Sequence, residues 1–178
     1  MARVVVHATT SLDGFMAGPH DEVGWSFKFG SDEMAEESIK EIGSVVLGNR
    51  GFKDGFMNED TIPYGGMVKV PQFVVTHEPR KPITMGGLTF TFVDGIQPAV
   101  QQAKVAAGDK NVALLGASID QQCLRAGLVD EIMIHVVPIL LGEGIRLFDH
   151  LGGRSMELKR TAIVSTGEVT SLRFRVLK

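Results

Sequence analysis

The chain has 178 residues, of which 44% are hydrophobic and 22% charged, values that are typical of one globular domain with a substantial core. Its net charge of −3 argues against a general nucleic-acid or membrane-surface binder. The single cysteine excludes an internal disulfide and a cysteine-rich metal site, and the histidines show no metal-ligand spacing with carboxylates. No apolar run reaches membrane-spanning length and no signal peptide follows Met1, so we expect a cytoplasmic protein of one domain, residues 1–178, without a metal.

Strand and helix patterns alternate along most of the chain. Strands are predicted at residues 3–10, 44–47, 72–76, 88–93, 112–115 and 131–137, and helices at residues 32–42, 96–107 and 117 to about 127. SLDGFMAGP and residues 53–70 are predicted loops. Two final strands, residues 157–165 and 169–177, are joined by Thr166-Gly167. This order predicts an α/β protein with a mostly parallel, helix-covered sheet and antiparallel strands at its end.

Three turns of small or polar residues follow predicted strands, at the sheet edge where ligands bind in such folds. In GNRGF, Arg50 is suited to phosphate oxygens. In THEPRKP, Arg80 and Lys81 follow His77 and could meet an adenosine 2′-phosphate. The turn Gly116 to Ser118 opens a helix, whose free N–H groups and dipole favour a pyrophosphate. The alternative for each turn is an ordinary surface turn or a packing contact.

The sequence contains neither a G-x-S-x-G nucleophile motif nor a Walker-type loop. Phosphate-binding turns without a nucleophile fit hydride transfer, in which the cofactor carries the chemistry. Asp13, the only acid in SLDGFMAG, could donate a proton if burial raised its pKa, or it could brace its own turn, which is the commoner role. Trp25 and Phe52, with Phe27 and Phe56 nearby, could stack on a flat substrate ring or belong to the core.

Four segments in order, SLDGFMAG, VVLGNRGF, FVVTHEP and GLVDEI…VVPILLGEGIRLF, resemble the dihydrofolate-reductase-like family. The similar branch contains the reductase domain of bifunctional riboflavin-biosynthesis enzymes and its stand-alone bacterial relatives. The resemblance spans nearly the whole chain. It implies a three-layer α/β fold with a central mixed sheet and helices on both faces, NADPH as cofactor, and frequent homodimers.

The resemblance also implies site residues by position. The loop at residues 12–18 would cover the cofactor and the substrate, and Ala8 and Thr9 would lie near the nicotinamide. The other expected contacts are with the phosphates and the adenosine ribose. The predicted cofactor-binding residues are Ala8, Thr9, Gly48, Asn49, Arg50, Gly51, Thr76, His77, Leu115, Gly116, Ala117, Ser118 and Ile119.

Three positions depart from the family pattern. The family often has Arg at Asn49 and Thr at Gly51, and usually has the first of two adjacent glycines at Leu115. The sequence predicts an NADPH-dependent reductase that transfers hydride to a small heterocyclic substrate, pterin-like or ribosylaminopyrimidine-like, or to a carbonyl substrate. The departures motivate the alternative, a catalytically silent nucleotide-binding module. The apolar residues of PILLGEGIRLF and the final strands predict a homodimer, unless they simply complete the monomer core.

Overall fold

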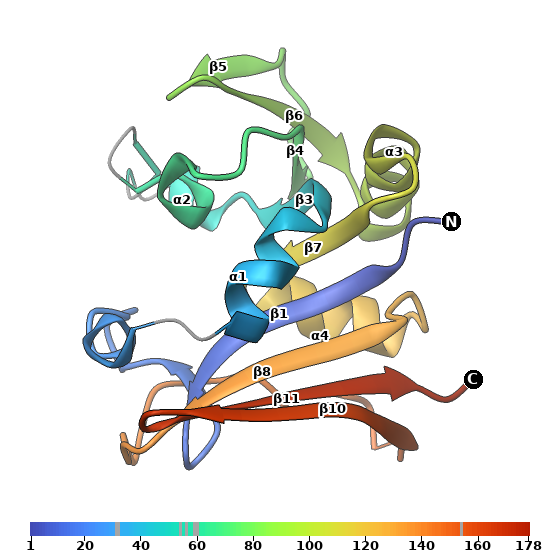
Figure 1. Cartoon of the computed structure of the whole chain (residues 1–178). Coiled ribbons are helices and arrows are strands. Elements are labelled where there is room, and N and C mark those ends of the chain that lie inside the picture. Colours follow the sequence, from blue (N-terminus) through green and yellow to red (C-terminus); the bar gives the residue numbers. More distant parts are fainter. Residues whose placement is uncertain (31–32, 54, 56, 59–60, 154) are drawn as a thin grey trace.

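A computed structural model describes residues 1–30, 33–53, 55, 57–58, 61–153 and 155–178. The main strands of this part of the chain are β1 (Val4–Ser11), β3 (Ile42–Gly48), β4 (Gln72–Thr76), β5 (Ile83–Met85), β6 (Leu88–Asp94), β7 (Asn111–Leu115), β8 (Glu131–Val137), β10 (Leu158–Thr166) and β11 (Val169–Val176). They form a nine-stranded sheet in the order β10-β11-β8-β1-β7-β3-β4-β6-β5 (Figure 1).

The sheet is mixed, as the sequence predicted. All pairs from β8 through β1, β7, β3 and β4 to β6 are parallel. The strands β11, β10 and β5 add antiparallel pairs at the two ends. Val4, Val6, Val45 and Val46 are fully buried, which explains why the central strands read as continuous apolar runs.

The helices are α1 (Glu33–Lys40), α2 (Arg50–Lys53), α3 (Ile96–Ala107) and α4 (Ala117–Arg125), with 3-10 turns η1 (Ser26–Phe29) and η2 (Pro63–Gly66). Figure 1 shows α1 on one face of the sheet and α3 and α4 on the other, which confirms the prediction of helices on both faces. Ala99 and Ala103 are fully buried in the cluster between α3 and the sheet. On the opposite face, Met34 of α1 packs against Val5 and Met133. No helix in these described ranges is long and apolar enough to cross a membrane.

Two local predictions were wrong. The segment SLDGFMAGP was expected to be a loop, but Phe15–Ala17 form β2, which pairs with β9 (Ile145–Arg146) in a second, two-stranded sheet. A three-residue strand is too short to show a period, and its partner lies far away in the sequence. The helix expected to reach Ile42 ends at Lys40, because Ile42 is already the first residue of β3. Asp32, its expected start, lies outside the described residues.

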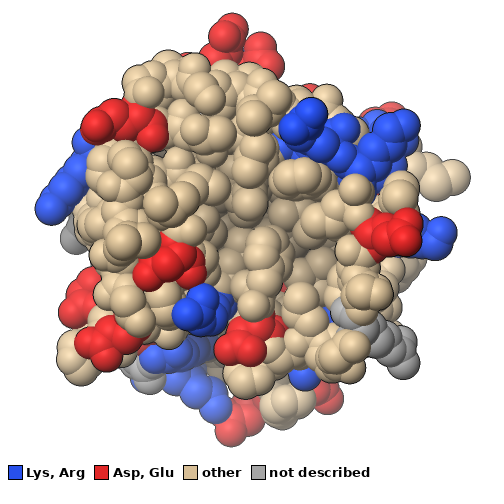
Figure 2. Space-filling model, turned by 90° about the horizontal axis from the view of Figure 1, so that it is seen from below, with Lys and Arg blue, Asp and Glu red and all other residues tan. Residues whose placement is uncertain are grey.

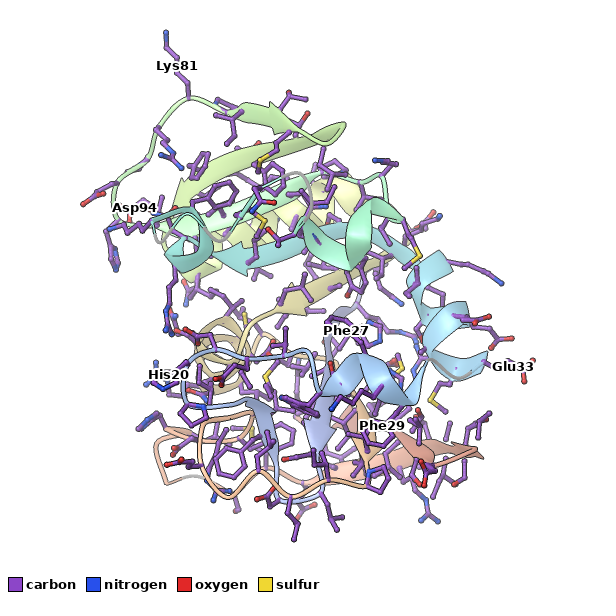
Figure 3. All side chains as sticks on the ribbon, turned by 90° about the vertical axis from the view of Figure 1, so that its left-hand side faces the viewer. His20, Phe27, Phe29, Glu33, Lys81 and Asp94 are labelled. Carbon is purple, nitrogen blue, oxygen red and sulfur yellow. The ribbon has the colours of Figure 1, made fainter. Side chains whose placement is uncertain are left out.

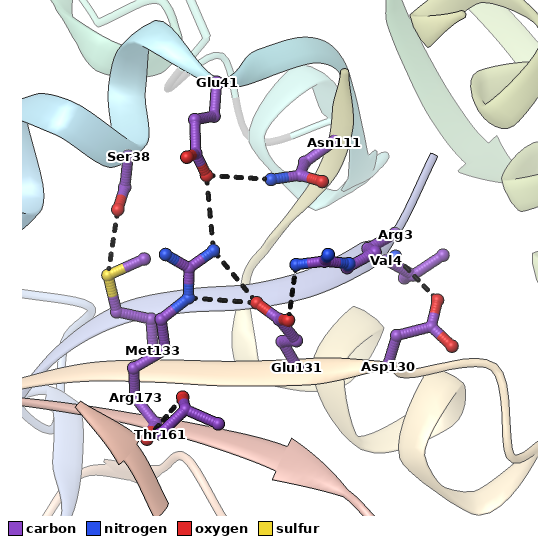
Figure 4. A network of polar contacts seen from close by, with 10 residues as sticks. All are labelled: Arg3, Val4, Ser38, Glu41, Asn111, Asp130, Glu131, Met133, Thr161 and Arg173. Carbon is purple, nitrogen blue, oxygen red and sulfur yellow. Dashed lines mark hydrogen bonds and ion pairs between the residues drawn. The ribbon is translucent and has the colours of Figure 1, made fainter. Parts of the chain in front are cut away.

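An ionic network fastens the amino-terminal end of β8 to its neighbours (Figure 4). Asp130 accepts a hydrogen bond from the Val4 amide at 2.9 Å. The buried carboxylate of Glu131 accepts hydrogen bonds from Arg3 at 2.8 Å and from Arg173 of β11 at 2.9 Å. Because a buried carboxylate is stable only when it is paired, Glu131 binds three strands together at this end of the sheet. Asp130 and Glu131 of the segment GLVDEI therefore have a structural role.

Candidate active site at the carboxyl ends of the parallel strands

The sheet opens between β1 and β7 at their carboxyl ends. β1 pairs with β7 only from Val4 to Val6, but it pairs with β8 as far as Ser11. Beyond Val6, the β7 side of β1 therefore has no ladder partner within the described part of the chain, and its backbone groups can bind a ligand. The predicted nicotinamide residues Ala8 and Thr9 lie on this stretch. Figure 3 shows His20, in the loop after β2, on the same side of the molecule as Asp94 at the end of β6.

The predicted phosphate and ribose turns lie together at this edge. Asn49 donates a hydrogen bond from Nδ2 to Oγ1 of Thr76 at 3.0 Å, which joins the turns after β3 and β4. A Cβ added to Gly48 would lie 3.6 Å from Cγ1 of Ile119, in the first turn of α4. The Oδ1 atom of Asn49 is buried and has no partner among the described residues. A buried polar atom of this kind is a candidate for a ligand contact.

The turn into α4 has the geometry of an anion site. Gly116 has φ of 101°, a region that favours glycine, and no atom lies within 4 Å of the place where its Cβ would be. The amides of Ala117 and Ser118 cannot have intrahelical acceptors, and the helix dipole adds partial positive charge there. Leu115 differs from these residues, because it pairs with Leu47 in the sheet and its side chain packs into the core.

The first turn of α4 also carries an acid that the sequence reading missed. Asp120 is fully buried, and neither carboxyl oxygen has a partner among the residues that the structure describes. Burial raises the pKa of Asp120 to about 8, so the group is neutral at pH 7 and does not repel an anion. Its position beside Ile119 was visible in the sequence, but its burial was not.

The basic side chains expected at the site differ in their positions. Arg50 forms an ion pair with Asp21, which connects the loop after β2 to α2. The Arg80 guanidinium stacks over the Phe92 ring at 4.1 Å. Lys81 points away from the rest of the molecule (Figure 3). His77 is exposed, and its Nδ1 atom lies 3.4 Å from Asp94.

The structure corrects the catalytic role suggested for Asp13. Its carboxylate accepts hydrogen bonds from Ser11 Oγ at 2.6 Å and from the amides of Leu141 and Gly142 at 3.2 and 2.8 Å. The Ser11 hydroxyl and these amides lower the pKa of Asp13 to about 2. A proton donor needs the opposite shift, so Asp13 is a brace, and it fixes the segment after β8 rather than only its own turn.

Neither predicted substrate aromatic has a free ring. Trp25 is 9% exposed, packs against Val137 and Val169, and donates its indole N–H to the Glu22 carbonyl. Phe52 makes edge contacts with Phe90 and Phe92, with ring centroids 5.2 and 5.3 Å apart. Trp25 is therefore a core residue, as the alternative reading held, and Phe52 belongs mainly to the core. Gly51, beside Phe52, would place a Cβ 3.6 Å from Met57, an ordinary contact.

The exposed aromatic in this region is Phe27, whose side chain is 77% exposed. Figure 3 shows Phe27 on the side of η1 toward β3 and β7 and Phe29 on the opposite side. Phe56, the fourth aromatic of the sequence prediction, lies outside the described residues.

A hydrogen-bonded chain of four side chains crosses the sheet face that α1 covers. Tyr64 Oη lies 3.2 Å from Nδ1 of His7, whose Nε2 lies 2.9 Å from Nε2 of His135. Nδ1 of His135 lies 2.5 Å from Oγ of Ser171. The sequence reading missed this chain. Its signal was one histidine inside each of two apolar strands, VVVHATT and IMIHVVP.

A cavity of about 520 Å³ lined by described residues lies elsewhere. It is lined by the end of α4, Val129 and the carboxyl-terminal residues Val176 to Lys178, near the start of β8. Ligands of parallel sheets bind at the opposite strand ends, so we assign the site to the opening beside β1. Within the described residues, no group of three or more His, Cys, Asp or Glu could hold a metal ion.

Comparisons with known proteins agree on one family and one fold. A family model described as the RibD C-terminal domain matches residues 2–172. The uncharacterized protein YyaP of Bacillus subtilis (strain 168) is 25% identical over 178 residues, covering 94% of this chain and 92% of YyaP. A crystal structure from Shewanella sp. PV-4, assigned to riboflavin biosynthesis, has a TM-score of 0.80 at 21% identity and covers 100% of both chains. Enterococcus faecalis dihydrofolate reductase, solved with NADP(H) and RAB-propyl, has a TM-score of 0.66 at 13% identity and covers 99% of this chain and 97% of its own.

Proposed function

The chain belongs to the RibD C-terminal domain family, as its motifs predicted, and from this membership we propose that it is an NADPH-dependent reductase. Its substrate would be a small heterocycle, pterin-like or ribosylaminopyrimidine-like, or a small carbonyl compound. The observation that carries the proposal is the convergence of three turns, after β3, β4 and β7, beside the opening between β1 and β7. The likeness to solved structures, among them a dihydrofolate reductase, supports the fold, and the reaction is our inference.

The residues at the opening fit a dinucleotide. The amides at the start of α4 would bind the pyrophosphate, and neutral Asp120 would leave that anion unopposed. The buried Oδ1 of Asn49 would accept a hydrogen bond from a ribose hydroxyl. Arg80, which Phe92 holds in place, would meet the 2′-phosphate. When bound, NADPH supplies the hydride, and the unpaired edge of β1 at Ala8 and Thr9 would orient the nicotinamide.

Calorimetric titration with NADPH and NADH tests the cofactor assignment. We expect NADPH to bind at least about tenfold more tightly, because a charged hydrogen bond to the 2′-phosphate contributes roughly 1.5–3 kcal/mol. Arg80→Gln should remove this preference and leave NADH binding unchanged. Lys81→Gln is the matched control, because Lys81 points away from the site. Equal affinities in the wild type would refute the 2′-phosphate contact, and failure to bind either cofactor would refute the reductase.

The alternative function is a nucleotide-binding module without turnover, which Asn49, Gly51 and Leu115 favour because they depart from the family pattern. Two of these departures are structurally mild, since Leu115 belongs to β7 and Gly51 is not sterically required. A spectrophotometric screen of NADPH oxidation with pterins, ribosylaminopyrimidines and quinones decides between the two functions. Steady, acceptor-dependent oxidation supports the reductase. Tight NADPH binding without oxidation by any acceptor supports the silent module.

A further inference from the structure

The chain of Tyr64, His7, His135 and Ser171 lies within one sheet face, beside the opening. His7 of β1 and His135 of β8 project to the face that α1 covers, as do Val5 and Met133 two residues before them. Ser171 of β11 is the register partner of His135. Tyr64 reaches His7 from η2, a segment that packs on the β3 side of the sheet. The chain therefore connects the two halves of the sheet where β1 and β7 separate.

The two imidazoles can share one proton. A contact of 2.9 Å between their Nε2 atoms requires one nitrogen to donate and the other to accept. If the pair takes up an extra proton, the resulting positive charge is spread over both rings. A second extra proton would place two positive charges side by side and is strongly disfavoured. The pair is thus suited to hold and release a single proton.

The hydrogen-bonded chain has a buried end, at Ser171 and His135, and a more exposed end, at His7 and Tyr64. Ser171 is fully buried and His135 is 6% exposed, whereas His7 and Tyr64 are partly exposed. Burial, with a further contribution from the charge of Asp120, raises the pKa of the Tyr64 phenol far above neutrality. Tyr64 therefore keeps its proton at neutral pH and can act as a hydrogen-bond donor.

We propose that Tyr64, His7 and His135 form a proton relay that protonates the substrate while hydride is transferred to it. The proposal rests on the proposed reductase function and names its proton donor. When bound, NADPH would supply the hydride to a substrate carbon and become NADP⁺, and the adjacent nitrogen or oxygen of the substrate would accept the proton from Tyr64 Oη. His7 passes its Nδ1 proton to Tyr64 and receives one at Nε2 from His135. The histidine pair thereby gives up its extra proton and becomes neutral.

The roles within the relay differ. Tyr64 is the catalytic residue, since its hydroxyl would touch the substrate. His7 recharges Tyr64, and His135 is a positioning residue that Ser171 orients. Among the described residues, Glu41 and Arg173 line a small cavity together with His7, and Asp120 acts electrostatically on Tyr64. Arg173 pairs with both Glu41 at 3.2 Å and Glu131 at 2.9 Å, so its charge is balanced by carboxylates.

Kinetics with an acceptor that the wild type reduces provides the first test. Tyr64→Phe should lower kcat by about 10²-fold, a usual effect of losing a general acid, while NADPH affinity changes less than about twofold. The wild-type kcat should fall as the pH rises and the pair loses its proton. His135→Gln should lower kcat and flatten this pH profile, because Gln keeps hydrogen bonds but cannot pass on a proton. His150→Gln, at an exposed histidine far along the sequence, is the control and should behave as the wild type.

Imidazole nitrogen NMR is a second test that needs no turnover. The ring signals of His7 and His135 should report one shared proton between about pH 4 and 9, and pterin added to the NADP⁺-saturated protein should shift both. Independent titration of each histidine would overturn the relay. So would a pterin effect that reaches the Gly116 amide but not the histidines, or unchanged kinetics in Tyr64→Phe, even for an active reductase. If no acceptor is reduced, the proposed function is refuted. In that case the pterin-induced shifts of the histidine signals alone decide on the relay, and their absence overturns it.

Discussion

Asp120 is a carboxyl whose environment favours its neutral form. An aspartate in the unfolded chain ionises near pH 3.8, but in the folded protein Asp120 ionises only near pH 8. Between these values the folded state holds a proton that the unfolded state has lost, so the free energy of unfolding decreases as the pH rises. The decrease in the free energy of unfolding amounts to roughly 3–6 kcal/mol once the pH exceeds about 8. A carboxyl kept at this cost without a hydrogen-bond partner among the described residues fits a ligand-binding role.

Asp120→Asn should remove this pH dependence. Urea unfolding of both proteins at several pH values from about 4 to 9 measures it, and the difference between them isolates the one carboxyl. We expect the variant to gain stability relative to the wild type as the pH rises, with the gain levelling off above about pH 8. Parallel stability curves would show that Asp120 ionises normally. NADPH binding at pH 7 should persist, since Asn is neutral like the protonated acid.

The pKa of Asp13 is shifted in the opposite direction to that of Asp120, so its effect on stability has the opposite dependence on pH. Its pKa is lowered from 3.8 to about 2, so it stabilises the fold above about pH 4, and this contribution is lost as the pH falls through about 2. Asp13→Asn should lower the Tm at neutral pH by a few degrees, because the Leu141 and Gly142 amides lose a charged acceptor. The Tm difference should shrink in acid. In an active enzyme the pH profile of kcat should keep its shape, and a lost acidic limb would restore the catalytic interpretation.

At the level of elements, the amino-terminal ends of β1 and β8 and the carboxyl-terminal part of β11 depend on Glu131. Removing its charge leaves Arg3 and Arg173 without their buried partner. Glu131→Gln should therefore destabilise the protein by about 3–5 kcal/mol. Denaturant unfolding measures this loss, and Glu168→Gln, in the exposed turn between β10 and β11, should change stability very little. NADPH affinity of the folded variant should stay normal, because the network lies at the opposite strand ends from the site.

The elements that the sequence predicted are those with local signals. The buried strands β1, β3, β4 and β7 are continuous apolar runs, and the turn at Gly116 follows one of them, so the sheet edge and its anion-binding turn could be inferred. Features that depend on distant contacts could not. The strand β2 is defined only by β9, and Asp13 gains its role from amides 128 and 129 residues away. The histidine pair also joins positions 128 residues apart, and no local pattern relates them.

At the scale of the whole molecule, uncharged side chains gather on one surface, beside β10. Figure 2 shows this side, with much of its centre uncharged and Lys, Arg, Asp and Glu mostly toward the rim. β10 is an edge strand of the sheet. Several large apolar side chains of the final strands and of PILLGEGIRLF are exposed: Leu140, Phe148, Leu158, Ile163 and Leu177. They do not complete the monomer core, and exposed apolar groups beside an unpaired strand edge favour association.

We therefore propose a homodimer that uses this surface, and sedimentation at micromolar concentration tests it. The wild type should sediment at about twice the monomer mass of 19.3 kDa. Ile163→Asp should give the monomer, because a carboxylate placed at the centre of an apolar contact loses its hydration without gaining a partner. Val105→Asp is the matched control, since Val105 is 76% exposed on α3, outside the predicted interface segments. A wild-type species of monomer mass would contradict the dimer. Dissociation by Val105→Asp but not by Ile163→Asp would instead move the interface to α3.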